Sequence, residues 1–358
     1  MHSKSNDARL WFILVTGRCN LRCRYCGGSF PEKYVPHGLR FDISILKNII
    51  RPCDNVCFYG GEPLLNVDDI LRIVNTLKVK KFIIQTNATL VENVPAELWK
   101  KIDVVLLSID GIEEITDKNR GRGVYRKVIN AARYLRKIGF KGELIARMTV
   151  TEDSDIYRDV THLLKLGLFD KIHWQLNVVW CDYWDFEKWA WKSYVPGFYR
   201  LVKLFLEYAE HGVVLKIVPI TGMLTAILYK PNVGVPCGAG YRAFAINSDG
   251  RILACPIAVR EMWATVGDVW RGITRTVTVG EPCVHCPYFR ICGGRCLYAY
   301  IERTWGEDSF RDICRVTIAC IEAVLRISDK IRKLVECGVV KKDEIFQDGI
   351  EDSTEIIP

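Results

Sequence analysis

The chain has 358 residues, of which 49% are hydrophobic and 26% are charged, a balance typical of a globular protein with a large core. Its length exceeds that of one typical domain and predicts two packed units. The formal net charge of +8 mildly favours an anionic substrate, cofactor or partner. It falls far short of a nucleic-acid-binding signature, and we expect no nucleic-acid partner.

Neither export nor membrane insertion is predicted. The N-terminus lacks an apolar stretch followed by small residues, and the longest apolar run, 213–229, is broken by Lys216 and Pro219. We therefore expect a cytoplasmic protein with no membrane partner. Fifteen cysteines are unusual in such a chain, because a reducing cytosol leaves disulfides little role. Metal binding is the natural explanation for them.

Six β-branched runs alternate with amphipathic segments through the first half of the chain. Strands are predicted at 11–16, 55–59, 81–86, 102–109, 143–150 and 171–178. Helices are predicted between them at 42–50, 67–77, 95–101, 123–138 and 154–166. Several of the strands are apolar on both faces, as expected where helices or a barrel interior cover both sides. The series predicts an α/β fold, either an open doubly wound sheet or an incomplete TIM-like barrel.

The pattern changes after residue 178. Residues 180–199 are crowded with aromatic side chains, and a helix is predicted to follow as far as residue 210. The segment 237–314 is rich in Gly, Pro and Cys, with short strands predicted at 243–247 and 251–254. A last helix is predicted at 312–337, followed by an acidic, solvated tail. These changes divide the chain into a barrel core at 1–180, an aromatic-rich helical bridge at 181–236, a Cys-rich domain at 237–315, and a terminal helix with its tail at 316–358.

Three cysteines lie on the loop after the first predicted strand, namely Cys19, Cys23 and Cys26. At spacings of four and three residues, their thiolates can hold three irons of a [4Fe–4S] cubane and leave the fourth iron without a protein ligand. An open coordination position is what a catalytic metal site needs. On spacing alone, a zinc knuckle that borrows a fourth ligand such as His37 is the alternative.

The motif Cys-x₃-Cys-x₂-Cys, with Tyr25 before its last cysteine, resembles the signature of radical S-adenosylmethionine (SAM) enzymes. Gly60, Gly61 and Glu62, at the end of the second predicted strand, resemble the Gly-Gly-Glu element of that family. Two glycines let the backbone approach a ligand closely, and a carboxylate can accept hydrogen bonds from an ammonium group. The resemblance covers roughly 11–178. It implies that SAM chelates the open iron and that Glu62 binds its amino group. It also implies that reductive cleavage yields a 5′-deoxyadenosyl radical, which abstracts hydrogen from the substrate.

Further residues near strand ends are candidate SAM ligands by the same resemblance. It implies that Asn87 and Ser108 contact the ribose, Arg147 the carboxylate and Tyr25 the adenine. All would face the catalytic rim of a parallel barrel. The alternatives are turn caps for Asn87 and Ser108, a surface ion pair for Arg147 and core packing for Tyr25.

Seven further cysteines lie in the second half of the chain: Cys237, Cys255, Cys283, Cys286, Cys292, Cys296 and Cys314. Their order and spacing resemble those of the SPASM domain, an extension of radical SAM enzymes that carries two auxiliary [4Fe–4S] clusters. The resemblance implies a distal cluster on Cys283, Cys286, Cys292 and Cys314, and a nearer cluster on Cys237, Cys255 and Cys296. Out of context, the Cys-x₂-Cys pair would suggest a zinc ribbon equally well.

The nearer cluster has only three assigned cysteines. Ala243 occupies the position where some members carry a further cysteine, so this cluster keeps an open iron or takes a ligand from elsewhere. Cys181 is a candidate ligand, with an inert thiol as the alternative. Cys57 and Cys320 are predicted to pack in the core as small hydrophobic residues.

Together these resemblances imply a partial (β/α)₆ TIM-like barrel with a Cys-rich SPASM extension and a terminal helix. The implied cofactors are SAM and three [4Fe–4S] clusters, and the implied reaction forms a thioether, C–C or related bond in a peptide or protein. Sulfatase maturases carry an Asp, which acts as the base, directly after the second SPASM cysteine. Here Cys255 is followed by Pro256, which argues against formylglycine formation unless Asp110 or Asp249 substitutes. Asp110 is the candidate catalytic base.

Partners are implied by the same resemblance. About ten residues precede the first predicted strand, too few for a leader-binding domain, so a separate protein or the enzyme body is expected to bind any leader peptide. The aromatic stretch 180–199 either lines a peptide groove or packs a helix on the barrel. A ferredoxin- or flavodoxin-type reductant is expected. The competing classes are a radical SAM enzyme acting on a small molecule, such as a porphyrin, and a non-catalytic zinc or electron-carrier protein.

Overall fold

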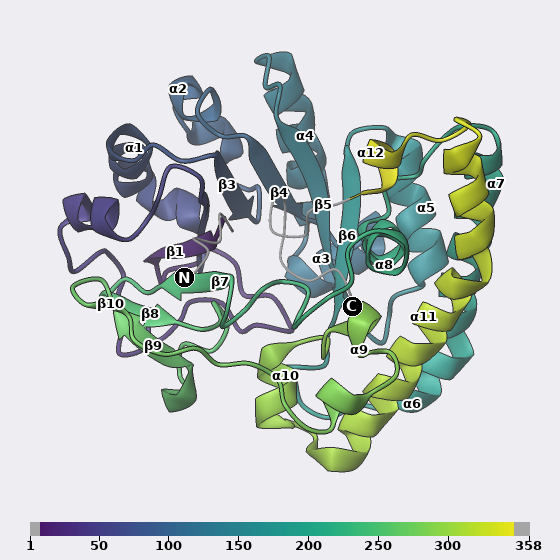
Figure 1. Cartoon of the computed structure of the whole chain (residues 1–358). Coiled ribbons are helices and arrows are strands. Elements are labelled where there is room, and N and C mark those ends of the chain that lie inside the picture. The colour runs from purple at the N-terminus through teal and green to yellow at the C-terminus, as the bar shows by residue number, and fades with distance from the viewer. Residues whose placement is uncertain (1–7, 347–358) are drawn as a thin grey trace.

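A ten-stranded sheet forms the centre of the computed structural model, which describes residues 8–346 (Figure 1). Its first six strands, all parallel, are β1 (Leu10–Thr16), β2 (Asn55–Gly60), β3 (Lys81–Thr86), β4 (Val104–Ser108), β5 (Glu143–Val150) and β6 (Lys171–Leu176). They lie side by side in chain order. All six predicted strands are confirmed. Residues 347–358, most of the predicted acidic tail, lie outside the described residues.

Helices connect the successive strands. They are α1 (Val67–Thr76), α2 (Ala96–Trp99), α3 (Glu113–Arg120), α4 (Val124–Lys137) and α5 (Ile156–Leu166), while the connection between β1 and β2 contains only a 3₁₀-helix at Ile43–Asn48. The sequence did not predict α3, because its residues are almost all polar and show no apolar period. The sheet is open, and the predicted partial (β/α)₆ barrel is confirmed.

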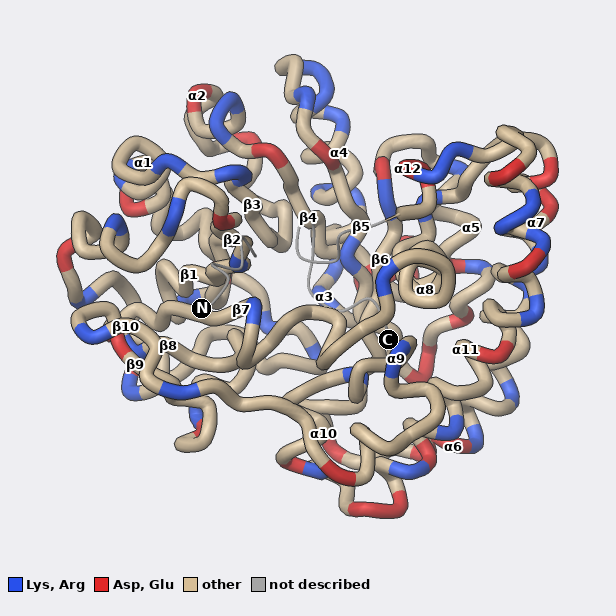
Figure 2. The backbone as a smooth tube through the Cα atoms, in the orientation of Figure 1, with Lys and Arg blue, Asp and Glu red and all other residues tan. Residues whose placement is uncertain are grey.

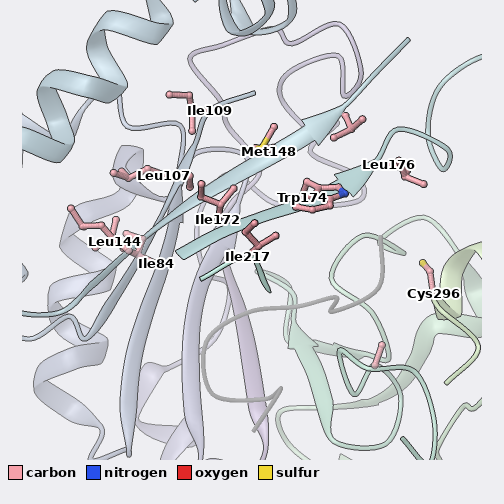
Figure 3. Packing of buried hydrophobic residues seen from close by; sticks show 14 of the residues in the cluster. Ile84, Leu107, Ile109, Leu144, Met148, Ile172, Trp174, Leu176, Ile217 and Cys296 are labelled. Carbon is pink, nitrogen blue, oxygen red and sulfur yellow. The ribbon is translucent and has the colours of Figure 1, made fainter. Parts of the chain in front are cut away.

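The strands are buried on both faces. Alternate residues of β1 belong to separate apolar clusters, with Trp11 and Ile13 in one and Phe12 and Leu14 in the other. Figure 3 shows part of the larger cluster, which includes Ile84 of β3 and side chains of β4 to β6. Burial on both faces explains why the sequence of these strands reads as continuous apolar runs.

The chain returns to the sheet after a helical segment, composed of α6 (Phe186–Trp189), a π-helical turn (Ala190–Tyr194), α7 (Val195–Glu210) and α8 (Val218–Leu228). β7 (Ala243–Ile246) then pairs in parallel with β1. β8 (Arg251–Leu253), β9 (Thr265–Asp268) and β10 (Gly272–Ile273) continue the sheet with antiparallel pairing. The segment after the barrel is thereby attached to the first strand. Within the described residues, no helix is long and apolar enough to cross a membrane.

Short helices and one long helix complete the chain. They are α9 (Phe289–Cys292), α10 (Leu297–Glu302), α11 (Gly306–Glu336) and α12 (Lys342–Ile345). α11 packs on α7 and α8 at the side of the barrel (Figure 1). It begins earlier than predicted, where Glu307 and Asp308 favour a helix N-terminus, and it runs across the predicted boundary at 315/316. Charged residues are frequent on α4, α7 and α11 (Figure 2).

Candidate active site

The carboxyl ends of β2 to β6 and the loop after β1 surround a cavity of about 220 Å³. Parallel strands bring all their carboxyl ends to one rim, so residues far apart in the sequence meet there. The cavity wall includes most of the residues singled out from the sequence: Cys19, Cys23, Tyr25, Cys26, Gly60, Gly61, Asn87, Ser108 and Arg147. The wall does not include Glu62 or Asp110.

The inner face of the strands changes character along its length. Apolar residues such as Cys57, Ile83 and Ile145 belong to the inner cluster. Two residues further along the same strands, Tyr59, Gln85 and Arg147 line the cavity. Since side chains two apart in a strand point to the same face, the barrel interior is apolar at its base and polar at its rim.

The cysteine loop after β1 differs in exposure from one thiol to the next: Cys23 is buried, Cys19 is half-buried and Cys26 is exposed. A hydrogen bond from the Cys23 thiol lowers the pKa of Cys26 to about 6, and the same contact together with burial raises the pKa of Cys23. The Arg120 cation acts in the direction of a lower pKa on both thiols. A neighbouring cation favours the thiolate, which is the form that binds iron.

The three thiols are not arranged around a single ion. Within residues 8–346, no group of three Cys, His, Asp or Glu side chains is placed to hold one metal ion. A cubane offers a separate iron to each cysteine, so its three sulfurs need not converge on one point. The donor set, three thiols on one loop facing an open cavity, fits a cluster with one iron left for a further ligand.

Two glycines fix the position of this loop. A Cβ atom on Gly60 would lie 2.2 Å from the Thr16 carbonyl oxygen, and one on Gly61 would lie 2.1 Å from that of Arg18. Gly60 also has φ +135°, a region that favours glycine. The backbone N–H groups of Gly61 and Glu62 donate to Thr16 and Arg18 at 3.0 and 2.7 Å. The end of β2 is therefore in direct contact with the start of the cysteine loop.

Glu62 is held by hydrogen bonds behind the cavity wall residues Thr86 and Asn87 and does not itself line the cavity. Its carboxylate is 1% exposed and accepts hydrogen bonds from the Thr86 hydroxyl (2.7 Å) and from the backbone N–H groups of Asn87 (2.7 Å) and Leu64 (3.0 Å). Burial raises the pKa of Glu62 to about 7, against the effect of these three donors. In this structure Glu62 ties the end of β2 to the end of β3, and its contact with the SAM amino group stays a prediction.

The Asp110 carboxylate already accepts four hydrogen bonds from within the protein. It is buried and accepts two hydrogen bonds from Arg120 (2.7 and 3.0 Å), one from the Tyr25 hydroxyl (3.0 Å) and one from the Thr149 N–H (2.9 Å). Four donors leave this carboxylate little capacity to take a proton from a substrate. Arg120 was missed by sequence reasoning, because it lies on the unpredicted helix α3. The second candidate base, Asp249, is hydrogen bonded to Arg251 and lies off the cavity wall.

A second cavity of about 50 Å³ adjoins the first. It is lined by Cys237, Cys255 and Cys296, which are the set implied for the nearer auxiliary cluster. Ala243 also lines it. The two cavities share five wall residues: Tyr59, Gln85, Arg147, Gln175 and Ile257. Cys181 is not on this wall, and its thiol donates to the Asn177 carbonyl oxygen at 3.1 Å.

The four cysteines implied for the distal cluster lie near one another. The charges of Cys286 and Cys314 act on Cys283, and those of Cys283 and Cys314 act on Cys292. Burial raises the pKa of Cys292 to about 12. Folding thus gathers residues from a 3₁₀-helix, from α9 and from α11. Cys57 and Cys320 are buried, as predicted.

Residues 13–164 match the family described as the radical SAM superfamily. The chain contains a radical SAM domain, and its relatives support an enzyme of this class. A cysteine-type anaerobic sulfatase-maturating enzyme of Clostridium perfringens is 26% identical over 78% of this chain and 85% of its own length. An uncharacterized protein of Archaeoglobus fulgidus is 27% identical over 81% of this chain and 74% of its own length. The predicted SPASM subgroup is confirmed through the maturase relatives.

Solved structures share the fold. The structure titled native anSMEcpe with bound AdoMet and Cp18Cys peptide has a TM-score of 0.69 and 20% identity, over 90% of this chain and 99% of the other. Streptococcus suis SuiB bound to the precursor peptide SuiA has a TM-score of 0.50 and 20% identity, over 81% of this chain and 72% of the other. The overall fold is therefore common to these proteins.

The aromatic stretch serves mainly for packing. Trp184, Trp189 and Tyr194 are in ring contact, and Tyr194 and Phe198 are buried. Trp180 differs, because it is 38% exposed and lies on the wall of the larger cavity. Packing of a helix on the barrel thus accounts for most of the stretch, while its first residue faces the site.

Proposed function

We propose that this enzyme abstracts hydrogen from a peptide or protein substrate and so forms a thioether, C–C or related bond. When bound at the cysteine loop, a [4Fe–4S] cluster and SAM supply a 5′-deoxyadenosyl radical for this step. The observation that carries the proposal is the cavity itself. Its wall combines Cys19, Cys23 and Cys26, on the loop after β1, with residues from the ends of β2 to β6, and every residue predicted to bind SAM except Glu62 lies on it.

The wall residues that the sequence singled out each have a proposed role in binding SAM. The Gly60–Gly61 backbone holds the end of β2 against the cysteine loop, leaving room for the amino acid part of SAM. Arg147, 5% exposed on β5, binds the SAM carboxylate, and Ser108, its neighbour in register on β4, binds the ribose together with Asn87. The ring of Tyr25, whose hydroxyl is fixed by Asp110, lies against the adenine.

Two auxiliary clusters complete the proposed set of three. Cys237, Cys255 and Cys296 hold the nearer one beside the SAM cavity, and the four distal cysteines hold the other. The wall shared by the two cavities supports a short path between substrate and nearer cluster. Ala243 provides no ligand, so the nearer cluster has an iron open to water or to a substrate group.

A peptide substrate is supported by the relatives. One is described as a sulfatase-maturating enzyme, and two solved structures with this fold are described with bound peptides. Formylglycine formation is disfavoured here, because among the described residues no Asp, Glu, His or Lys lines the cavity. We therefore favour a reaction that requires no protein base at the reacting carbon.

Exposed basic residues on the cysteine loop suggest which electron carrier could bind there. Arg18, Arg22 and Arg24 are exposed beside Cys26, a surface suited to an acidic one-electron carrier of the ferredoxin or flavodoxin type. A separate protein that binds a leader peptide is compatible with this scheme. Clusters held by accessible thiolates need a reducing compartment, which supports the cytoplasm.

The test is anaerobic reconstitution followed by product analysis. The protein should bind roughly twelve iron ions per chain and cleave SAM to 5′-deoxyadenosine with dithionite. Mass spectrometry of candidate peptides co-expressed with the enzyme should then show a mass loss in one of them. Zinc in place of iron and no SAM cleavage would indicate the non-catalytic alternative. Cleavage stimulated by small molecules such as porphyrins, but never by peptides, would indicate the small-molecule alternative.

A further inference from the structure

Arg295 is a buried cation on the wall of the active-site cavity, in the turn between Cys292 and Cys296. It is 6% exposed, and its Nη2 atom has no hydrogen-bond partner. Its backbone has φ +57°, in the left-handed region that residues with side chains seldom adopt. Gly293 and Gly294 before it also have positive φ values. The fold therefore keeps a long charged side chain where glycine would cost less, a feature often found at functional sites.

The other two arginines of this cavity have identified roles. Arg120 forms a two-point ion pair with Asp110, and Arg147 is proposed to bind the carboxylate of SAM. Arg295 has no ion pair with a carboxylate from residues 8–346. A buried charge without a counter-ion is strongly unfavourable. The thiolates of bound clusters can balance this charge in part, while Nη2, to which no described residue is hydrogen bonded, leaves a position for an anion on a bound molecule.

Arg295 acts electrostatically on two of the cysteines proposed for the distal cluster. The Arg295 cation acts to lower the pKa of Cys292 and Cys314, although burial raises both values. In the proposed function these two cysteines hold the distal cluster. Arg295 thus stands between the distal cysteines and the cavity, with its side chain among the wall residues that also include Trp180 and Asn177.

We propose that Arg295 binds a carboxylate of the substrate, which is either the C-terminus of a peptide or an Asp or Glu side chain. This proposal rests on the proposed function and adds the substrate class, an acidic one. A guanidinium forms two parallel hydrogen bonds with a carboxylate, which fixes orientation as well as position.

The test compares acid and amide probes on the reconstituted holoenzyme with SAM bound. The probes are pools of N-acetylated tetrapeptides, carrying either Asp or Asn at one position, each with a free or an amidated C-terminus. A further pair of pools contains small organic acids, such as succinate and benzoate, and their amides. Anaerobic ultrafiltration followed by mass spectrometry measures the amount of each probe that the enzyme retains.

Wild-type enzyme should retain at least one acid pool about tenfold more strongly than its amide counterpart, since hydrogen bonds to charged groups are the stronger ones. Arg295→Gln should remove this preference. Arg290→Gln is the matched control, because it removes one positive charge from an exposed residue of the same segment. The Asp/Asn and free/amidated pairs distinguish a side-chain carboxylate from a C-terminal one. Far-UV circular dichroism and iron content check folding, and Arg295→Lys provides a second variant that keeps the charge and should keep part of the preference.

Two results would overturn the proposal: no acid preference in wild type, or a preference that persists in Arg295→Gln. In the second case, a shift of the distal cluster's midpoint potential in the variant would assign Arg295 to that cluster instead. A preference seen only with small acids would support Arg295 as the carboxylate site while contradicting the peptide substrate.

Discussion

The two cysteine regions of this enzyme are built in different ways. Cys19, Cys23 and Cys26 lie on one loop, 19–26, held in place by the glycines at the end of β2. The seven cysteines proposed to hold the auxiliary clusters are spread over 237–314, and only the folded chain sorts them into two groups. A site made by one loop depends mainly on local geometry, whereas a distributed site depends on packing. Damage to the first should stop SAM cleavage itself, and damage to the second should stop only the later conversion of the substrate.

The largest effect is expected at the loop. Cys23→Ala removes the buried member of the three thiols, so it should lose about four iron ions per chain and all 5′-deoxyadenosine formation. Iron analysis and chromatography of dithionite-reduced samples measure both. Cys53→Ala, at an exposed cysteine outside both regions, is the control and should behave as wild type. Full SAM cleavage by Cys23→Ala would contradict the proposed mechanism.

The matching change in the second region should separate two activities. Cys286→Ala should also lose about four iron ions, yet it should still cleave SAM, because the cysteine loop is untouched. Formation of the modified product, measured by mass spectrometry, should disappear. If Cys286→Ala still makes product, the distal cluster is dispensable and the two regions are less coupled than we propose.

A smaller effect is expected from the contact that holds the loop. Gly61→Ala places a methyl group 2.1 Å from the Arg18 carbonyl oxygen, so the backbone must shift. We expect the free energy of unfolding to fall by about 1–3 kcal/mol, as in overpacked cores, and SAM affinity to fall measurably. Gly38→Ala is the control, because its methyl group meets no atom within 4 Å. Chemical denaturation and equilibrium binding measure the two quantities, and equal values for the two variants would show that Gly61 is not needed for close approach.

The smallest effect on the chemistry is expected at Asp110. Asp110→Asn breaks a buried ion pair with Arg120, which should lower the free energy of unfolding by about 3–5 kcal/mol. Asp153→Asn, at a more exposed pair with Lys118, should cost about 0–1 kcal/mol. Residual product formation should persist in Asp110→Asn at a temperature where the variant is folded. A stable variant without any product would instead assign Asp110 as the catalytic base.

The sequence predicted the six parallel strands and most element positions because these depend on local patterns. The six apolar runs matched the six parallel strands, and the last helix followed its three- and four-residue spacing. Helix α3 was missed because the residues on its buried face are mostly polar, so its sequence shows no apolar periodicity. Arg120 lies on this helix and was missed with it. The roles of Glu62 and Asp110 also required the structure, since a carboxylate in a sequence does not show how many donors surround it.

The sequence by itself therefore determined the family, the cysteine loop and the glycine contact, all of which are encoded within a few neighbouring residues. Tertiary structure alone decided which side chains reach the cavity, because that depends on how strand ends distant in the chain meet. It placed Arg295 on the same wall as the residues proposed to bind SAM and left Glu62 off that wall. The spacing of neighbouring residues sets which cofactor chemistry they can support, while the packing of distant segments decides which side chains reach the cavity.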